Sequence, residues 1–278
     1  MSFNIGISQV LHNLRLINRD LETVTTHLAT GKRINSSKDD PAVWASIQRS
    51  RSEFGNYTAI NDSLNGVATS IHIADGSMDA IGKTMGEMKN TLETISANDP
   101  PLPIGNAERS KLLRAYGEMR RQIDQLSAPT DEGAKKIMAD PAIGGPDDWT
   151  IVVGPNGVIR TIRKEEVHTG PTGLNIPELN ENSTDVEIQQ ALTSLDAAKD
   201  TLTARRKTLE LDGVAIARAQ EYNGKLATAH LVHAENSEAA DMNEAAARAK
   251  SLELRQTLSS ESLKLLTDAE TRILQLLA

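Results

Sequence analysis

The chain has 278 residues and a formal net charge of −8, and it lacks the clustered lysine and arginine side chains that binding to nucleic acid requires. It contains no cysteine, which excludes disulfides, thiolate metal sites and cysteine nucleophiles. Aromatic residues make up 3 % of the chain, so a compact core built on large aromatic side chains is not expected. We expect instead an elongated, mainly α-helical protein with aliphatic contacts.

Residues 7–28 predict a helix with a single narrow apolar stripe. The apolar positions alternate at spacings of three and four, which is the pattern of a coiled-coil seam. A stripe this narrow is typical of a helix with one partner helix, not of a helix surrounded by a globular core. The stripe consists of Ile7, Val10, Leu14, Ile17, Leu21, Val24 and Leu28.

The segment HLATGKRINSSKDDPAVWAS, residues 27–46, interrupts the helical pattern with glycine, charged and small polar residues. Gly31 is the residue type that closes a helix in the left-handed conformation. Asp39 or Asp40 suits the N-cap of a following helix, and Pro41 suits its first turn. We therefore predict that one helix ends here, the chain turns and a second helix begins.

The second helix is predicted to be long. The alternation of apolar residues continues from residue 57 to residue 95 without a slip, which is typical of a coiled coil or rod. Prolines at 100, 101 and 103 end it, and a third helix with the same rhythm covers residues 112–126. The stripe of the second helix consists of Tyr57, Ile60, Leu64, Val67, Ile71, Ala74, Met78, Ile81, Met85, Met88, Leu92 and Ile95.

Residues 127–184 differ in character, because they hold six of the ten prolines and a β-like segment. Residues 149–153 and 158–163 are rich in β-branched side chains and flank the turn sequence Gly-Pro-Asn-Gly, so they predict a β-hairpin. We expect this insertion, in the middle of a helical chain, to lie at the end of a helical hairpin.

Helix is predicted again from residue 185 to the C-terminus. A stripe recurs every seven residues at Leu195, Leu202, Leu209 and Ile216. The stretch at residues 238–256 is rich in alanine, glutamate and arginine, which favour helix. The final apolar positions are Leu263, Leu266, Ile273 and Leu277. Both ends of the chain thus carry apolar faces, which we expect to pair with each other and with neighbouring copies.

No catalytic, cofactor-binding or metal-binding residues are predicted. His230 and His233 share a helix face but have no third ligand at a metal-like spacing. Gly31 and Lys32 are similar to the end of a phosphate-binding loop, but the earlier glycine is missing and Arg33 stands where a hydroxyl is needed. We expect a protein that is not an enzyme.

The chain also lacks the sequence signals of membrane insertion and of ordinary secretion. No run of 18 apolar residues is present, so we expect no membrane-spanning helix and no membrane partner. The first residues lack the basic start and apolar segment of a cleavable signal peptide. By these rules the protein is either cytosolic or exported by a route that needs no such signal.

Two motifs, one near each end of the chain, resemble those of bacterial flagellins. ATGKRINSSKDDPA, residues 29–42, is similar to the N-terminal flagellin signature. ADMNEAAARAKSLELRQTLSSESLKL, residues 240–265, is similar to the C-terminal signature. The apolar ending at residues 273–277 also resembles a flagellin terminus. The resemblance is specific because both motifs occur in the expected order.

The resemblance implies three layers, with paired N- and C-terminal helices as an assembly seam made of the terminal stripes given above. Residues 1–42 and 236–278 would form an inner coiled-coil layer, and residues 43–126 and 185–235 would form a helical rod. Residues 127–184 would be a short variable insertion that faces outward and carries the β-hairpin.

The resemblance also implies a role for the interrupted segment, as an inter-layer joint that supplies hydrogen bonds and charge and touches neighbouring subunits. Its residues are Gly31, Lys32, Arg33, Asn35, Ser36, Lys38, Asp39 and Asp40. The implied function is a structural subunit that self-assembles, as a helical homopolymer, into the secreted, extracellular filament of the bacterial flagellum for motility. Flagellar export chaperone, junction and cap proteins would be its other partners.

Two alternatives remain open at this point. Residues 36–41 also fit a Ser-x-x-Asp-Asp-Pro pattern that resembles hook–filament junction proteins, although the C-terminal motif favours flagellin. The ending LLTDAETRILQLLA departs from the common flagellin terminus. From a different class, an intracellular coiled-coil scaffold requires nothing beyond the heptad stripes.

Overall fold

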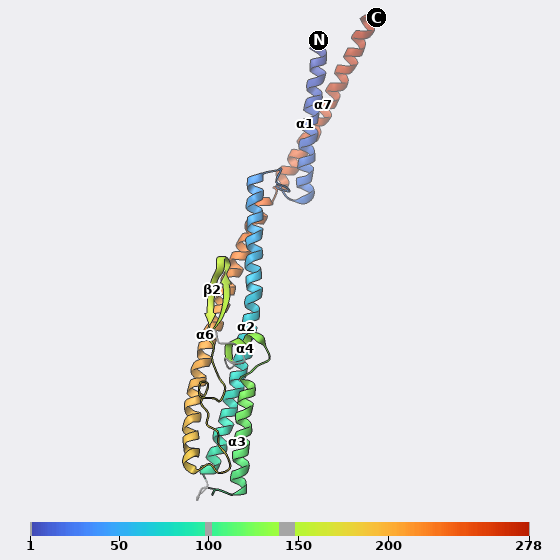
Figure 1. The fold of residues 1–278 in the computed structure, drawn as a ribbon. Helices are drawn as coiled ribbons and strands as arrows, with labels where there is room; N and C mark the ends of the chain where they lie inside the picture. Colours follow the sequence, from blue (N-terminus) through green and yellow to red (C-terminus); the bar gives the residue numbers. More distant parts are fainter. Residues whose placement is uncertain (1, 98–101, 139–147, 278) are drawn as a thin grey trace. The chain divides into compact units, whose positions relative to one another are not determined.

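The computed structural model describes residues 2–97, 102–138 and 148–277 (Figure 1). Within these residues the chain is mainly α-helical, with one antiparallel two-stranded sheet, which confirms the predicted fold class. The chain divides into two compact units. The first contains residues Met1–Phe54 and Thr228–Ala278, and the second contains residues Gly55–Ala227. Helices α2 (Pro41–Ser96) and α6 (Asp185–Glu238) contribute residues to both units.

In the first unit, α1 (Ser2–Thr30) and α7 (Met242–Leu277) pack side by side (Figure 1). Val24 is buried against Ala245, Ala249 and Leu252, and the small alanines let the helices approach closely. The predicted pairing of the two terminal helices is therefore confirmed. The seam positions that are half-buried are Ile7, Val10, Leu14, Ile17, Leu21, Leu28, Leu263 and Leu266. The side chains of Ile273 and Leu277 lie outside the described part of the structure.

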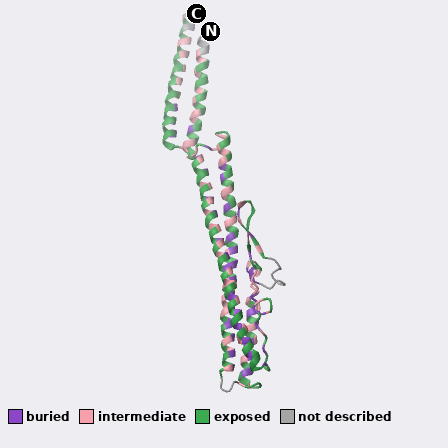
Figure 2. Ribbon diagram, turned by 90° about the vertical axis from the view of Figure 1, so that its left-hand side faces the viewer, coloured by how far each residue is buried: buried purple, intermediate pink, exposed green. Residues whose placement is uncertain are grey.

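In the second unit, α2 and α6 share a long core with α3 (Ala107–Leu126). The predicted apolar stripe of α2 is confirmed, because every position in it is buried except Ile60, which is half-buried. The four heptad positions predicted on α6 are buried as well. Figure 2 shows these buried residues along the facing sides of the helices. The apolar periodicity thus identified the core-facing side of each long helix.

The hairpin is confirmed as β1 (Trp149–Gly154) and β2 (Val158–Ile162), joined by the 3-10 turn η1 (Pro155–Gly157). We expected the hairpin to lie at the end of the pair of long helices, and this expectation is wrong. Arg160 instead forms an ion pair with Asp212 on α6 at 2.7 Å, and Asn223 of α6 donates to the Val153 carbonyl at 2.9 Å. Burial of Ile151 and Ile162 explains this position, because the inner face of the hairpin needs an apolar surface.

The other described parts of the central insertion, outside residues 139–147, also fold back onto the helices. The short helix α4 (Glu132–Met138), which the sequence did not indicate, buries Ala134, Ile137 and Met138. The chain after the hairpin then runs along α3, where Asp124 accepts hydrogen bonds from the backbone and hydroxyl of Thr169. These contacts make the described parts of the insertion members of the core of the second unit.

Candidate functional site

The segment between α1 and α2 lies within the first unit and begins at Gly31. Its φ of 70° is left-handed, which a glycine adopts without the steric cost of a Cβ. The Gly31 N–H donates to the carbonyl of His27 at 2.8 Å, which closes the last turn of α1. The Gly31 carbonyl accepts from the N–H of Ala240 at 3.0 Å. The predicted end of the first helix is confirmed, and it is joined there to the C-terminal part of the chain.

Asp39 organises the turn that follows. One carboxylate oxygen accepts hydrogen bonds from the backbone N–H groups of Asn35 and Ser36, each at 2.9 Å, and from the Ser36 hydroxyl at 3.3 Å. These two backbone donors lower the pKa of the Asp39 carboxyl, because they stabilise its ionised form. Asn35 adds a side-chain hydrogen bond to the Lys32 carbonyl at 2.9 Å. The turn is therefore held by local polar contacts.

Asp40, and not Asp39, caps the second helix. Its side-chain oxygen accepts from the N–H groups of Ala42 and Val43, each at 3.0 Å. Pro41 is the first residue of α2, where its missing N–H leaves no hydrogen bond unmade. The two adjacent carboxylates thus have separate structural roles. The sequence alone did not decide which of them is the N-cap.

Glu238, at the end of α6, is the residue that sequence reasoning missed. Its side chain is 8 % exposed. Its carboxylate accepts two hydrogen bonds from Arg51, at 2.9 and 2.7 Å, and forms an ion pair with Lys32 at 3.0 Å. Its carbonyl accepts from the N–H of Arg33 at 2.7 Å. Lys32 also forms an isolated antiparallel bridge with Ala239. These contacts connect the joint, at Lys32 and Arg33, to the segment that leads into α7.

An apolar contact supports the polar one. Ile34 is 2 % exposed and packs with Ile47 of α2 and Ala234 of α6, and Val43 and Trp44 cover this cluster. A buried isoleucine in the middle of a polar segment fixes the turn against the two helices. The signal for it was present in the sequence, since Ile34 is the single large apolar residue between Gly31 and Pro41.

The predicted joint residues do not all face inward. Gly31, Lys32, Asn35 and Asp40 are half-buried and make the contacts given above. Arg33 and Lys38 are exposed, and within the described residues the ammonium group of Lys38 forms no ion pair. The guanidinium of Arg33 donates a hydrogen bond to the carbonyl of Ser237 at 3.5 Å. Both side chains are nevertheless exposed at the surface of the joint.

A bound metal ion requires several ligating side chains close together. No group of three or more metal-ligating side chains comes together in the described residues. None of the helices in the described ranges is long and apolar enough to cross a membrane. The joint geometry is built from caps, ion pairs and an apolar cluster, all of which position helices.

A chain with paired terminal helices, long heptad stripes and a joint closed by ion pairs belongs to the class of helical structural subunits. Residues 1–141, about half of the chain, match the N-terminal helical region of bacterial flagellin. The chain therefore belongs to the bacterial flagellin family. It is a structural subunit that self-assembles into the flagellar filament, and it is not an enzyme.

Relatives match along nearly the whole length. Flagellin FljK of Caulobacter vibrioides is 25 % identical over 273 residues, which are 98 % of this chain and 96 % of the relative. Flagellin C of Rhizobium meliloti is 22 % identical over 319 residues, which cover 98 % of this chain and 97 % of the relative. The similarity thus extends through both units and through the central insertion.

Proposed function

We propose that the chain polymerises through its paired terminal helices, which form the inner layer of the filament with residues 1–42 and 236–278. Residues 43–126 and 185–235 form the rod, and the insertion at 127–184 faces outward. The observation that carries this proposal is the packing of α1 against α7 along the apolar stripe. In this arrangement the joint residues 31–40 connect the layers, and the exposed Arg33 and Lys38 contact neighbouring subunits.

Exposed leucines on both terminal helices support contacts between copies. α1 and α7 pair through one stripe, but leucines also lie outside it, and they are between 37 % and 71 % exposed. These residues are Leu11, Leu16, Leu254, Leu258 and Leu265. Full burial of a leucine stabilises by about 1.5–3 kcal/mol, so several such contacts per copy favour assembly. Heterologous contacts generate an open helical filament when the rotation between copies does not close into a ring, and we propose that arrangement here.

Electron microscopy tests the proposal directly. Purified full-length protein is negatively stained under salting-out conditions, with and without preformed filament seeds. Long uniform filaments are the expected result. Monomers that cap or join other filaments would instead indicate a hook–filament junction protein, and small closed oligomers would indicate a coiled-coil scaffold.

The finer localisation and partners are also part of the proposal. We infer that the chain is exported through the flagellar apparatus to the cell exterior, and that an export chaperone and the junction and cap proteins are its partners. Membership of the flagellin family and the exposed leucines of α7, which a chaperone would cover before assembly, support this. The test is expression in a flagellated strain that lacks its own flagellins. Retention of all the protein inside the cell would contradict export.

A further inference from the structure

The second unit contains three Asn-Gly pairs, and their structural settings differ. They are Asn65–Gly66 in α2, Asn156–Gly157 in the turn of the β-hairpin, and Asn223–Gly224 in α6. An asparagine followed by glycine can react with its own backbone, because no Cβ on the glycine shields the neighbouring nitrogen. That nitrogen attacks the side-chain carbonyl carbon of the asparagine, so a folded chain permits the reaction only where these two atoms can meet.

The pair in the hairpin turn is open to solvent. Asn156 and Gly157 are both exposed, and their φ angles of 59° and 77° are left-handed. Apart from its chain neighbours, no atom of the described residues lies within 4 Å of the position that a Cβ on Gly157 would occupy. The hydrogen bond at Val153 and the ion pair at Arg160 hold the hairpin to α6 on either side of this turn. The turn can therefore change conformation while the strands stay in place.

The reaction requires such a change in the backbone. Asn156 has a ψ of 27°, and rotation about this bond moves the Gly157 nitrogen toward the side-chain carbonyl carbon. Gly154 and Gly157 bracket the turn, and glycine adopts more backbone conformations than any other residue. The strand register is also irregular beside the turn, between Val152 and Gly154, where a bulge disrupts the ladder. The reactive conformation is thus within reach without unfolding of the helices.

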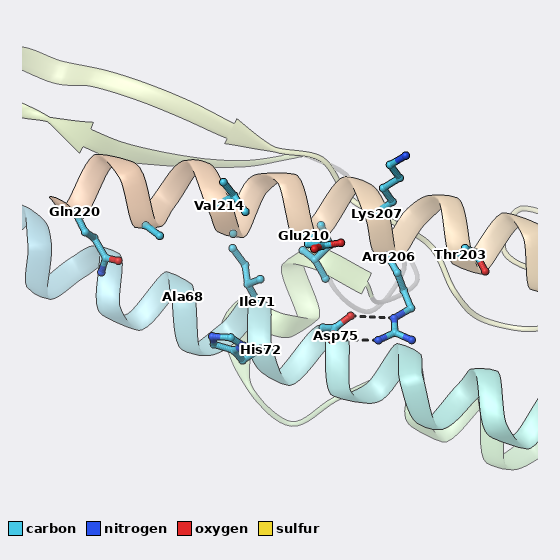
Figure 3. Close-up of a pocket in the computed structure, with 13 residues that line it drawn as sticks. Ala68, Ile71, His72, Asp75, Thr203, Arg206, Lys207, Glu210, Val214 and Gln220 are labelled. Atoms are coloured by element: carbon cyan, nitrogen blue, oxygen red, sulfur yellow. Dashed lines mark hydrogen bonds and ion pairs between the residues drawn. The ribbon is translucent and has the colours of Figure 1, made fainter. Parts of the chain in front are cut away.

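The two helical pairs are protected from this reaction. In a helix each N–H donates to the carbonyl four residues earlier, so the nitrogens of Gly66 and Gly224 are fixed in the helical backbone. Asn65 is exposed, but its side chain accepts a hydrogen bond from Gln220 at 2.8 Å, and Figure 3 shows Gln220 reaching from α6 toward α2. Asn223 is 2 % exposed, and its side-chain amide donates to the hairpin backbone at 2.9 Å.

A left-handed backbone alone does not make an asparagine reactive. Asn175 has a φ of 51° and is exposed, but Ile176 follows it. The β-branched side chain of Ile176 crowds the nitrogen that would attack, and its N–H donates to the carbonyl of Thr169 at 3.0 Å. Asn156 differs from Asn175 because a glycine in open space follows it.

We propose that Asn156 is a site of spontaneous deamidation and isomerisation at the tip of the hairpin. The Gly157 nitrogen forms a bond to the Asn156 side-chain carbonyl carbon. The side-chain nitrogen leaves as ammonia, together with the proton of the Gly157 nitrogen, and a five-membered succinimide remains. Water then opens the ring at one of its two carbonyl groups. Opening at the side-chain carbonyl gives aspartate, and opening at the main-chain carbonyl gives isoaspartate.

Both products change the turn. Each replaces a neutral amide by a carboxylate, which is ionised at neutral pH and adds one negative charge to the hairpin tip. Isoaspartate also routes the backbone through the side chain, which lengthens the turn by one carbon. The proposal does not depend on polymerisation, because every reacting atom belongs to one chain and the co-reactant is water.

Peptide mass spectrometry of the purified full-length protein, incubated in neutral buffer and sampled over time, tests the proposal. Asn65, Asn175 and Asn223 are controls within the same sample. We expect the mass increase of deamidation to appear at Asn156 at least tenfold faster than at any of these three. Enzymatic methylation by an isoaspartate-specific methyltransferase should label the same Asn156 peptide.

Hydroxylamine gives a second readout, because it opens a succinimide and cuts the chain between the asparagine and the glycine. The folded protein should yield fragments 1–156 and 157–278. The protein unfolded in guanidinium should instead be cut at all three Asn-Gly pairs at similar rates. This control shows whether the fold, rather than the local sequence, selects Asn156.

Asn156→Gly is the matched variant, because glycine accepts the left-handed backbone and has no side-chain amide. It should keep the helical content, measured by circular dichroism, and lose the cut in the folded state. Equal rates at the three Asn-Gly pairs of the folded chain, or a faster rate at Asn65 or Asn223, would overturn the inference. A cut at the hairpin that persists in the variant would also overturn it. All these readouts use the unassembled chain, so they stand or fall separately from filament formation.

Discussion

At the scale of single residues, the joint depends most on Glu238. Its nearly buried carboxylate holds Lys32 and Arg51, whose side chains are both 41 % exposed. Loss of one partner from a fully buried ion pair costs about 3–5 kcal/mol, but half-exposed cations recover much of their hydration. We therefore expect Glu238→Gln to reduce the free energy of unfolding of the first unit by about 1–2 kcal/mol.

Thermal unfolding followed by circular dichroism and amide hydrogen exchange of residues 31–40 measure this effect. Glu235→Gln, an exposed carboxylate on the same helix, is the control and should change neither. Equal effects of the two substitutions would show that the ion pairs of Glu238 with Lys32 and Arg51 make no specific contribution to the stability of the first unit.

Asp39 gives the joint a dependence on pH. Backbone hydrogen bonds from Asn35 and Ser36 lower its pKa below the usual value of 3.8. A lowered pKa in the folded state means that the stabilisation is present above the unfolded pKa and is lost as the pH falls through the folded value. We expect the N–H groups of Asn35 and Ser36 to become less protected from hydrogen exchange below about pH 3.8, after correction for the intrinsic rate.

The comparison is with Asp39→Asn, which cannot ionise. In this variant the N–H groups of Asn35 and Ser36 should be less protected from hydrogen exchange at neutral pH. Their acid-dependent loss of protection should disappear. An acid-dependent loss of the same size in Asp39→Asn would assign the effect to another group.

At the scale of elements, the long helices were predictable and the contacts between distant segments were not. Apolar periodicity marks a helix face locally, so the α2 stripe could be read from the sequence alone. Glu238 could not be placed, because its partners Lys32 and Arg51 lie near the other end of the chain and no spacing links them. The same limit applies to the position of the hairpin, which is decided by contacts with Asp212 and Asn223.

Helix α4 shows a different limit. It has seven residues, which is too short for apolar periodicity to distinguish it from a loop. Its Gly133 lies so close to Ser70 that a Cβ on the glycine would be 2.2 Å from the serine hydroxyl oxygen. Tertiary packing therefore fixes this helix, and a single sequence carries no record of that contact.

Substitutions in the exposed leucine stripe of α7 should impair assembly without affecting folding. Leu254 and Leu265 are 62 % and 71 % exposed and do not belong to the seam with α1. We expect the double substitution Leu254→Ser and Leu265→Ser to leave the helical content unchanged. The critical concentration for polymerisation should rise more than tenfold, because each leucine loses about 1.5–3 kcal/mol of burial between copies.

Sedimentation of the polymer measures that concentration, and Glu261→Ser on the same helix is the control. Glu261 is exposed and not apolar, so its replacement should have little effect. An unchanged critical concentration in the double variant would mean that this side of α7 faces solvent in the filament.

At the scale of the whole molecule, the two units have separate cores. The large apolar cluster of the second unit extends from Leu64 to Ile216 and includes no residue of α1 or α7. The first unit depends on two smaller clusters, one of which requires Val24 of α1. Deletion of residues 1–28 should therefore leave the second unit folded and expose the apolar face of α7.

We expect the truncated chain to be soluble, to keep the helical signal of the second unit, and to form no filaments, even with seeds. α7 then has no partner helix, and ordering it in a polymer is no longer offset by burial against Val24 and its neighbours. Circular dichroism and electron microscopy at several times the critical concentration of the full-length protein test this. Filaments from the truncated chain would show that the α1–α7 seam is dispensable for polymerisation.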